Sequence, residues 1–138
     1  MKTIRNILIV FFSVLLISCE SNPTNENKIS SGIAGDWLWK NTSGGFAGTT
    51  TTPINGNVHI LKITSDSNFV ELRNDTTTFT DKFTTRHNTF DDSSQSYLLI
   101  DFSTSRRFNL FVTKETTDSL VLSDMMMDGY ISVYTRIK

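Results

Sequence analysis

The chain has 138 residues, a formal net charge of −1 at pH 7 and a single cysteine. A strongly basic surface is the usual mark of a nucleic-acid-binding protein, so this charge balance argues against a nucleic-acid partner. One cysteine excludes an intrachain disulfide. The fold must therefore be held together by its packed core.

The first 18 residues have the layout of an export signal. Lys2 and Arg5 give the segment a positive start, and residues 7–17 are apolar except for Ser13. This apolar run is too short to span a bilayer. Residues 1–18 are therefore predicted to be a signal peptide that is removed on export.

The apolar run ends in the sequence Leu-Ile-Ser-Cys at residues 16–19. This sequence resembles the lipobox of bacterial lipoproteins, in which cleavage falls before the cysteine and its sulfur is diacylated. The resemblance implies that Cys19 is the first mature residue and holds the protein to the outer membrane, facing the periplasm or the cell surface. Several acyl chains on one residue make a permanent anchor, because each buried methylene contributes about 0.8 kcal/mol.

Composition divides the mature chain into a tether and one domain. Residues 19–30 are mostly Asn, Ser, Pro, Thr, Glu and Lys, which cannot bury enough apolar surface to stay ordered. Residues 31–138 have the size of a single domain. They include 18 threonines and 13 aromatic residues but only two alanines, and this composition favours strands over helices.

Apolar residues in this domain recur with a period of two, as in Leu61 and Ile63 or Leu120 and Leu122, and polar turn clusters separate these runs. The predicted strands are Gly35–Asn41, Asn57–Thr64, Asn68–Arg73, Thr77–Arg86, Ser96–Phe102, Arg107–Lys114, Ser119–Ser123 and Tyr130–Ile137. About eight short strands with tight connections predict an all-β, antiparallel up-and-down barrel. A two-sheet sandwich has the same strand count, but barrel closure removes exposed sheet edges.

The first predicted strand opens with Gly35-Asp36-Trp37, and Arg136 lies near the end of the last one. This arrangement resembles the lipocalin and wider calycin families, in which a late arginine packs over the tryptophan of a Gly-x-Trp motif. Residues 35–40, 43–50, 118–120 and 128–130 are similar to lipocalin-like lipoproteins of the Bacteroidetes cell envelope. The resemblance implies that Trp37 and Arg136 close one end of the barrel, through a cation–π contact of roughly 0.5–2 kcal/mol.

Two further aromatic residues are candidates for a ligand cavity. Trp39 has the same strand parity as Trp37 and should face the interior, where it either lines a cavity or fills the core. Residues 42–57 predict a long loop around Phe46, and loops of this length are uncommon without a function. In lipocalins the corresponding loop covers the open end, so the resemblance makes Phe46 a candidate lid. The alternative is that Phe46 caps the core.

Residues that could carry metal or catalytic chemistry are scattered. His59 and His87 are the only histidines, whereas a metal site usually needs three or four convergent ligands. No Gly-x-Ser-x-Gly motif is present, so nucleophilic hydrolysis has no support. Arg106 and Arg107 are interpreted as a solvated strand entrance, with an anion site as the alternative. The sequence predicts no metal, no cofactor and no enzymatic activity.

Two functions remain compatible with the sequence. The first is a monomeric, lipid-anchored barrel that binds a small hydrophobic molecule. The second is a packed barrel with no small-molecule ligand, which acts as a structural or protein-interaction lipoprotein. Side chains can fill a narrow eight-stranded barrel completely, so the volume of the interior decides between them.

Overall fold

A computed structural model describes residues 32–89, 96–104, 106–124 and 126–138, so the signal segment, Cys19 and the tether lie outside the described residues. The described part consists of nine strands: β1 (Gly35–Gly44), β2 (Thr49–Thr51), β3 (His59–Ile63), β4 (Asn68–Arg73), β5 (Thr76–Thr89), β6 (Ser96–Phe102), β7 (Leu110–Glu115), β8 (Ser119–Asp124) and β9 (Tyr130–Arg136). Within these ranges, no helix has the length and apolarity needed to cross a membrane.

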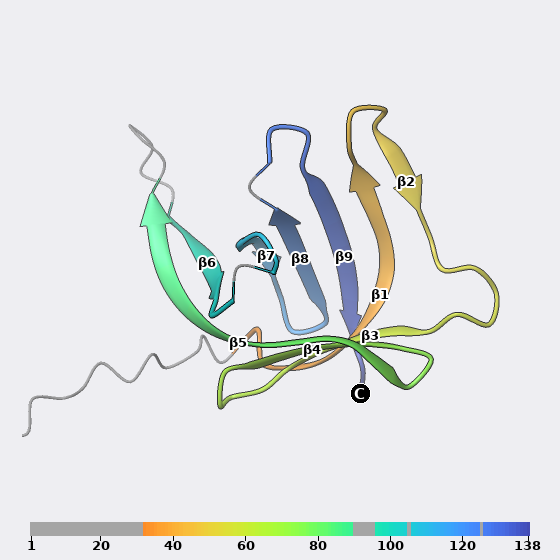
Figure 1. Cartoon of the computed structure of the whole chain (residues 1–138), viewed down its shortest axis with the longest axis horizontal. Helices are drawn as coiled ribbons and strands as arrows, with labels where there is room; N and C mark the ends of the chain where they lie inside the picture. The colour runs from red at the N-terminus through yellow and green to blue at the C-terminus, as the bar shows by residue number, and fades with distance from the viewer. Residues whose placement is uncertain (1–31, 90–95, 105, 125) are drawn as a thin grey trace, which may run out of the picture.

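Eight of the strands close into an antiparallel barrel. From β3 to β9 each strand pairs with the next along the chain, while β1 pairs with both β3 and β9 and so completes the ring. The additional strand β2 pairs only with the last residues of β1, beside the ring (Figure 1). This topology confirms the predicted all-β barrel, and each of the eight predicted strands has a counterpart. The sequence did not reveal β2, because its three residues are all exposed and show no alternation.

The long strand β5 lets the sheet curve onto itself. Its first half pairs with β4 and its second half pairs with β6. In Figure 1, β3 and β4 run across the lower side of the molecule, while β5 curves away from them and up towards β6. Register shifts at residues 71–72, 39–41 and 112–114 mark bulges, which bend strands and help a barrel to close.

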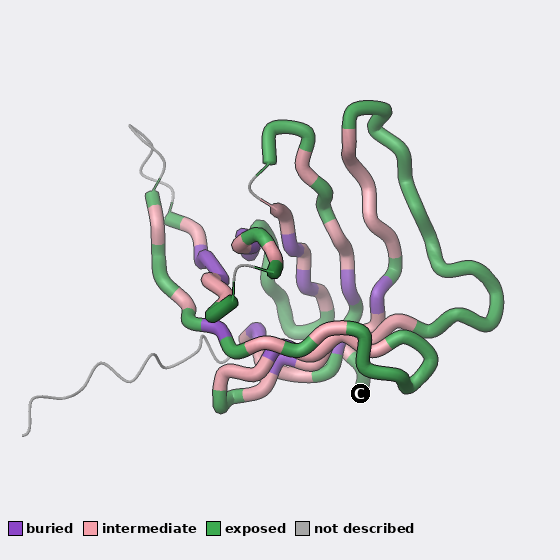
Figure 2. Tube along the Cα trace, viewed as in Figure 1, coloured by how far each residue is buried: buried purple, intermediate pink, exposed green. Residues whose placement is uncertain are grey.

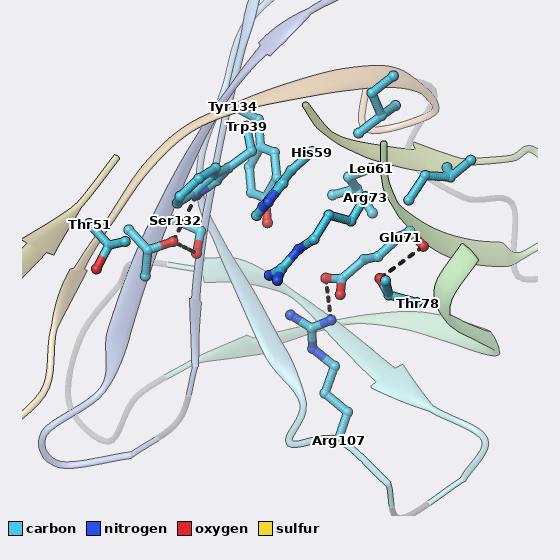
Figure 3. A pocket seen from close by; sticks show the side chains of 13 residues that line it. Trp39, Thr51, His59, Leu61, Glu71, Arg73, Thr78, Arg107, Ser132 and Tyr134 are labelled. Atoms are coloured by element: carbon cyan, nitrogen blue, oxygen red, sulfur yellow. Dashed lines mark hydrogen bonds and ion pairs between the residues drawn. The ribbon is translucent and has the colours of Figure 1, made fainter. Parts of the chain in front are cut away.

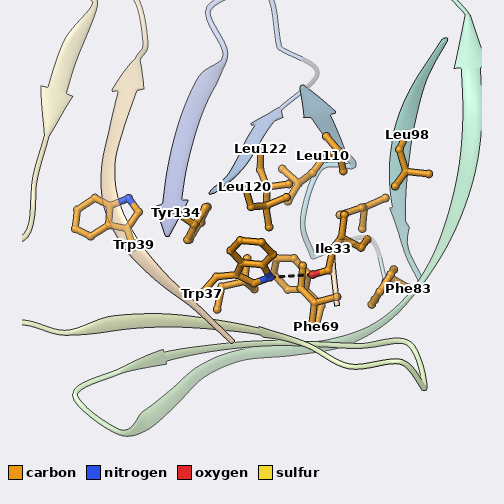
Figure 4. Packing of buried hydrophobic residues seen from close by; sticks show 14 residues of the cluster. Ile33, Trp37, Trp39, Phe69, Phe83, Leu98, Leu110, Leu120, Leu122 and Tyr134 are labelled. Atoms are coloured by element: carbon orange, nitrogen blue, oxygen red, sulfur yellow. Dashed lines mark hydrogen bonds between the residues drawn. The ribbon is translucent and has the colours of Figure 1, made fainter. Parts of the chain in front are cut away.

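Buried residues gather inside the barrel. Figure 2 shows them as purple segments, both on the upright strands and on the strands that run across the lower side of the molecule. The core residues alternate along β1, β3 and β8, as the period of two predicted, whereas three consecutive residues are buried in β6 and in β7. The buried core consists of Ile33, Trp37, Trp39, Leu61, Ile63, Phe69, Phe83, Leu98, Ile100, Leu110, Val112, Leu120, Leu122 and Tyr134. Figure 4 shows Trp37, Ile33 and Phe69 close together, with Trp39 set apart from them.

Trp37 and Arg136 lie directly opposite each other on β1 and β9. The Arg136 guanidinium carbon is 4.0 Å from the centroid of the Trp37 ring, and Trp37 is fully buried. The indole Nε1 donates a hydrogen bond of 2.8 Å to the carbonyl oxygen of Ile33. Ile33, Trp37 and Arg136 together fill the end of the barrel at which β1 begins and β9 ends, and we call this the closed end.

Arg136 also ties two separate segments to this end, the one before β1 and the turn between β7 and β8. Its side-chain nitrogens donate to the carbonyl oxygens of Gly32 at 2.6 Å, Ala34 at 2.8 Å and Thr117 at 2.6 Å. Gly35 has a φ of +147°, and a Cβ atom there would lie 2.2 Å from Nη1 of Arg136. Only glycine leaves room for the guanidinium, which gives the Gly-x-Trp motif its physical reason.

The contact between Trp37 and Arg136 predicts energetic coupling. In urea unfolding of the purified chain, Trp37→Ala should cost about 3–5 kcal/mol, because a fully buried indole is lost. Arg136→Ala should also destabilise, and the double variant should show a coupling energy of about 0.5 kcal/mol or more. The distant, exposed Arg86 is the control, because Trp37→Ala and Arg86→Ala should be additive. Additivity of Trp37→Ala with Arg136→Ala would contradict the contact.

Candidate ligand cavity

Part of the barrel interior is hollow. A cavity of about 360 Å³, partly open to solvent, lies between β1 and β9 on one side and β3 and β4 on the other (Figure 3). It is lined by Trp39, Thr42, Thr51, His59, Ile60, Leu61, Glu71, Leu72, Arg73, Thr78, Arg107, Ser132 and Tyr134. The interior is therefore filled at the closed end and open at the opposite ends of these strands.

One wall of the cavity is aromatic. The rings of Trp39 and His59 are stacked, with centroids 4.7 Å apart and an angle of 15° between their planes. Trp39 Nε1 donates to Thr42 Oγ1 at 2.8 Å, and that oxygen is also 2.8 Å from Ser132 Oγ. Tyr134 lies opposite Trp39 on β9. The hydrogen bonds through the hydroxyl groups of Thr42 and Ser132 fix the Trp39 indole, so this wall is flat and preformed.

The other wall carries an ion pair between Arg107 and Glu71. Arg107 comes from the connection between β6 and β7, and its guanidinium carbon lies 5.3 Å, 5.4 Å and 5.8 Å from the ring centroids of Phe69, Phe79 and Phe102. The rings of Phe69 and Phe102 meet edge to face at 5.0 Å. A carboxylate and three aromatic rings thus hold Arg107 in place.

A second arginine, Arg73, points into the same space (Figure 3). It lies at the end of β4, directly opposite His59 on β3. Within the described ranges of the chain, the Arg73 side chain forms neither an ion pair nor a hydrogen bond. The cavity therefore holds two arginines and one glutamate, an excess of positive charge.

Burial and these charges shift the pKa values of two lining residues. Burial, followed by the nearby charge of Arg73, lowers the pKa of His59 from its ordinary 6.5, against the opposing effect of Glu71. Burial, followed by the charge of Glu71, raises the pKa of Tyr134 to about 12. Both side chains are therefore uncharged at neutral pH, and the charges of the cavity are those of Glu71, Arg73 and Arg107.

Of the two aromatic candidates from the sequence, the structure places only one at the cavity. Trp39 lines it, whereas Phe46 is 98% exposed and belongs neither to the cavity wall nor to the core. The exposed position of Phe46 contradicts both interpretations from the sequence, as a lid over the cavity and as a cap on the core. The reason is that β1 continues to Gly44 and pairs with β2, so Phe46 lies in a hairpin turn instead of a long loop. The same turn is held to the segment before β9, because the Gly45 N–H donates a hydrogen bond of 3.0 Å to the carbonyl oxygen of Asp128.

Sequence reasoning did not place His59, Glu71 or Arg73 in a cavity, and it kept an anion site at Arg107 only as the alternative to a solvated strand entrance. The expected solvated strand entrance at Arg107 was wrong, because β7 begins only at Leu110 and Arg107 turns into the barrel. No local pattern signals this. His59 and Glu71, in contrast, share strand parity with the buried Leu61 and Phe69, so inward-facing polar residues could have been recognised.

Neither a metal cluster nor a known relative points to a function. Within the described ranges, no group of three or more His, Cys, Asp or Glu side chains is placed to hold a metal ion. Comparisons of the chain with models of known protein families, with curated proteins and with solved structures found no match. The function is therefore argued from the geometry of the cavity.

The opposing charges around His59 predict the direction of its titration. In an NMR pH titration, with His59→Gln identifying the resonance, the midpoint should lie below 6.5. Arg73→Gln should raise this midpoint and Glu71→Gln should lower it. Because the unfolded imidazole takes up its proton first, His59 also stabilises the fold above pH 6.5, and this contribution is lost as pH falls through the lowered pKa. A wild-type midpoint above 6.5 would contradict the arrangement.

Proposed function

We propose that this protein is a lipid-anchored lipoprotein of the bacterial cell envelope whose lipocalin-like barrel binds a small, largely apolar molecule. The observation that carries the binding role is the cavity of about 360 Å³ beside the packed core of the barrel. Sites for small molecules commonly have volumes of about 300–1,000 Å³, so this cavity suits a ligand at the small end of that range.

The lining supports an aromatic or otherwise flat ligand. Trp39, His59 and Tyr134 provide ring surfaces, and their positions are fixed by strand pairing and hydrogen bonds. A preformed site loses little conformational entropy when a ligand enters. The wall of Glu71, Arg73 and Arg107 shows that the cavity is not uniformly apolar, so the ligand has a polar end as well.

The alternative function, a packed barrel that acts only through its surface, has less support. Side chains do fill the closed end, where Trp37 and Phe69 are fully buried. They leave the space between Trp39 and Arg73 open. A barrel selected only for packing would have apolar side chains in place of the partly buried Glu71 and Arg107, because moving charged groups out of water is costly.

The proposed anchor rests on the N-terminal sequence, since Cys19 lies outside the described residues. Cys19→Ala should release the protein from membranes, because the lipid supplies the membrane affinity. Metabolic labelling with palmitate should mark the parent chain and not the variant, and membrane fractionation should follow the label. Membrane retention of the unlabelled variant would contradict the lipoprotein assignment.

The proposed binding site can be tested with a probe compound and with a substitution that places a larger side chain in the cavity. We expect 2-naphthamide, a neutral flat aromatic compound, to bind the purified full chain with one-to-one stoichiometry in isothermal titration calorimetry. Ser132→Phe should weaken binding by about tenfold or more, because the new ring occupies the cavity wall. Thr135→Phe is the control, since Thr135 is an exposed neighbour on the same strand and should leave binding unchanged.

Circular dichroism and thermal unfolding would establish that both variants remain folded. Equal binding by the Ser132→Phe and Thr135→Phe variants would place the probe outside the cavity. Such a result would favour the packed, surface-acting alternative.

A further inference from the structure

We infer that the cavity takes a planar aromatic anion, with its rings beside the stacked Trp39 and His59 and its acidic group on Arg73. This inference rests on the proposed binding function of the cavity and adds the chemical class of the ligand. It is carried by the unpaired guanidinium of Arg73 next to a preformed aromatic wall.

The charges that face the cavity do not balance. Arg107 is already satisfied, because its guanidinium is paired with Glu71 and packed against three phenylalanine rings. Arg73 has no such partner in the part of the chain that the structure describes. An incoming carboxylate or sulfonate would therefore find a free guanidinium, whose planar fork of N–H donors matches two anion oxygens.

The opposite charges act on different lining residues. After burial, which is the larger cause in both, the charge of Arg73 lowers the pKa of His59 and the charge of Glu71 raises the pKa of Tyr134. Arg73 is also directly opposite His59 in the strand register. An anionic group beside His59 would therefore lie next to Arg73.

Strand register brings Arg73 and the aromatic wall together. Arg73 and His59 are directly opposite on β4 and β3, so their Cβ atoms are neighbours on one face of the sheet. His59 in turn stacks on Trp39 of β1. One small rigid molecule can therefore touch the rings and the guanidinium at the same time, without the long flexible chain that separated sites would require.

A cationic ligand is disfavoured by the same arrangement. It would have to break the pair between Arg107 and Glu71 to reach a carboxylate, and it would leave both arginines uncompensated. A neutral ligand would gain the ring contacts but would form no ion pair with Arg73.

The experiment compares two compounds of the same shape, 2-naphthoate and its neutral amide 2-naphthamide, by isothermal titration calorimetry on the purified full chain. We expect the wild type to bind 2-naphthoate about tenfold more tightly than 2-naphthamide, because only the carboxylate forms an ion pair with Arg73 and offers two acceptor oxygens to its guanidinium. Arg73→Gln should bring this ratio close to one by weakening the anion alone. Arg86→Gln is the charge-matched control, since Arg86 is exposed and paired with Asp101 at 2.6 Å, and its ratio should stay at the wild-type value.

The outcomes separate this inference from the function on which it rests. Equal binding of the two compounds by the wild type, or a ratio that Arg73→Gln does not change, would overturn the aromatic-anion inference and leave a neutral ligand for the cavity. Failure of both compounds to bind would overturn the proposed binding function itself. Because Arg73 is exposed to solvent at the end of β4, its substitution by Gln should leave the fold intact, and thermal unfolding would verify this.

Discussion

The stack of Arg136 on Trp37 is the contact on which the rest of this barrel depends. It joins the first strand to the last, and the same guanidinium binds the carbonyl oxygens of Gly32, Ala34 and Thr117. Without a closed β1–β9 pairing, two strand edges would be exposed and the sheet could open or associate. Closure also sets the position of Trp39, which lies two residues further along β1 and faces the same interior.

The hollow part of the interior results from a change of residue type along the strands. At the closed end the inward positions hold large apolar residues such as Trp37 and Phe69, which fill the space completely. Further along, the cavity is lined by Thr42, Arg73 and Ser132, which are smaller or polar and leave space between them. Strand pairing changes along with composition, because β1 pairs with β3 over Gly35–Leu38 and with β2 over Thr42–Gly44.

The two arginines of the cavity have different physical roles. Arg107 is partly buried, and removal of a charge from water is costly unless it is compensated. Glu71 and the surrounding phenylalanine rings supply that compensation, so Arg107 acts as part of the wall. Arg73 remains exposed enough to keep its charge hydrated and needs no partner for the fold. An uncompensated charge of this kind can contribute to recognition without destabilising the protein.

The sequence by itself determined the fold class, the eight barrel strands and the identity of the closing pair. These features are local or motif-based, since a period of two, turn clusters and a Gly-x-Trp motif can be recognised within short segments. The tertiary structure decided the rest. Phe46 lies in solvent because β2 pairs with β1, and Arg107 enters the barrel because its connecting segment turns inward. His59 and Arg73 are neighbours only through strand register, a non-local property that no single segment of the chain carries.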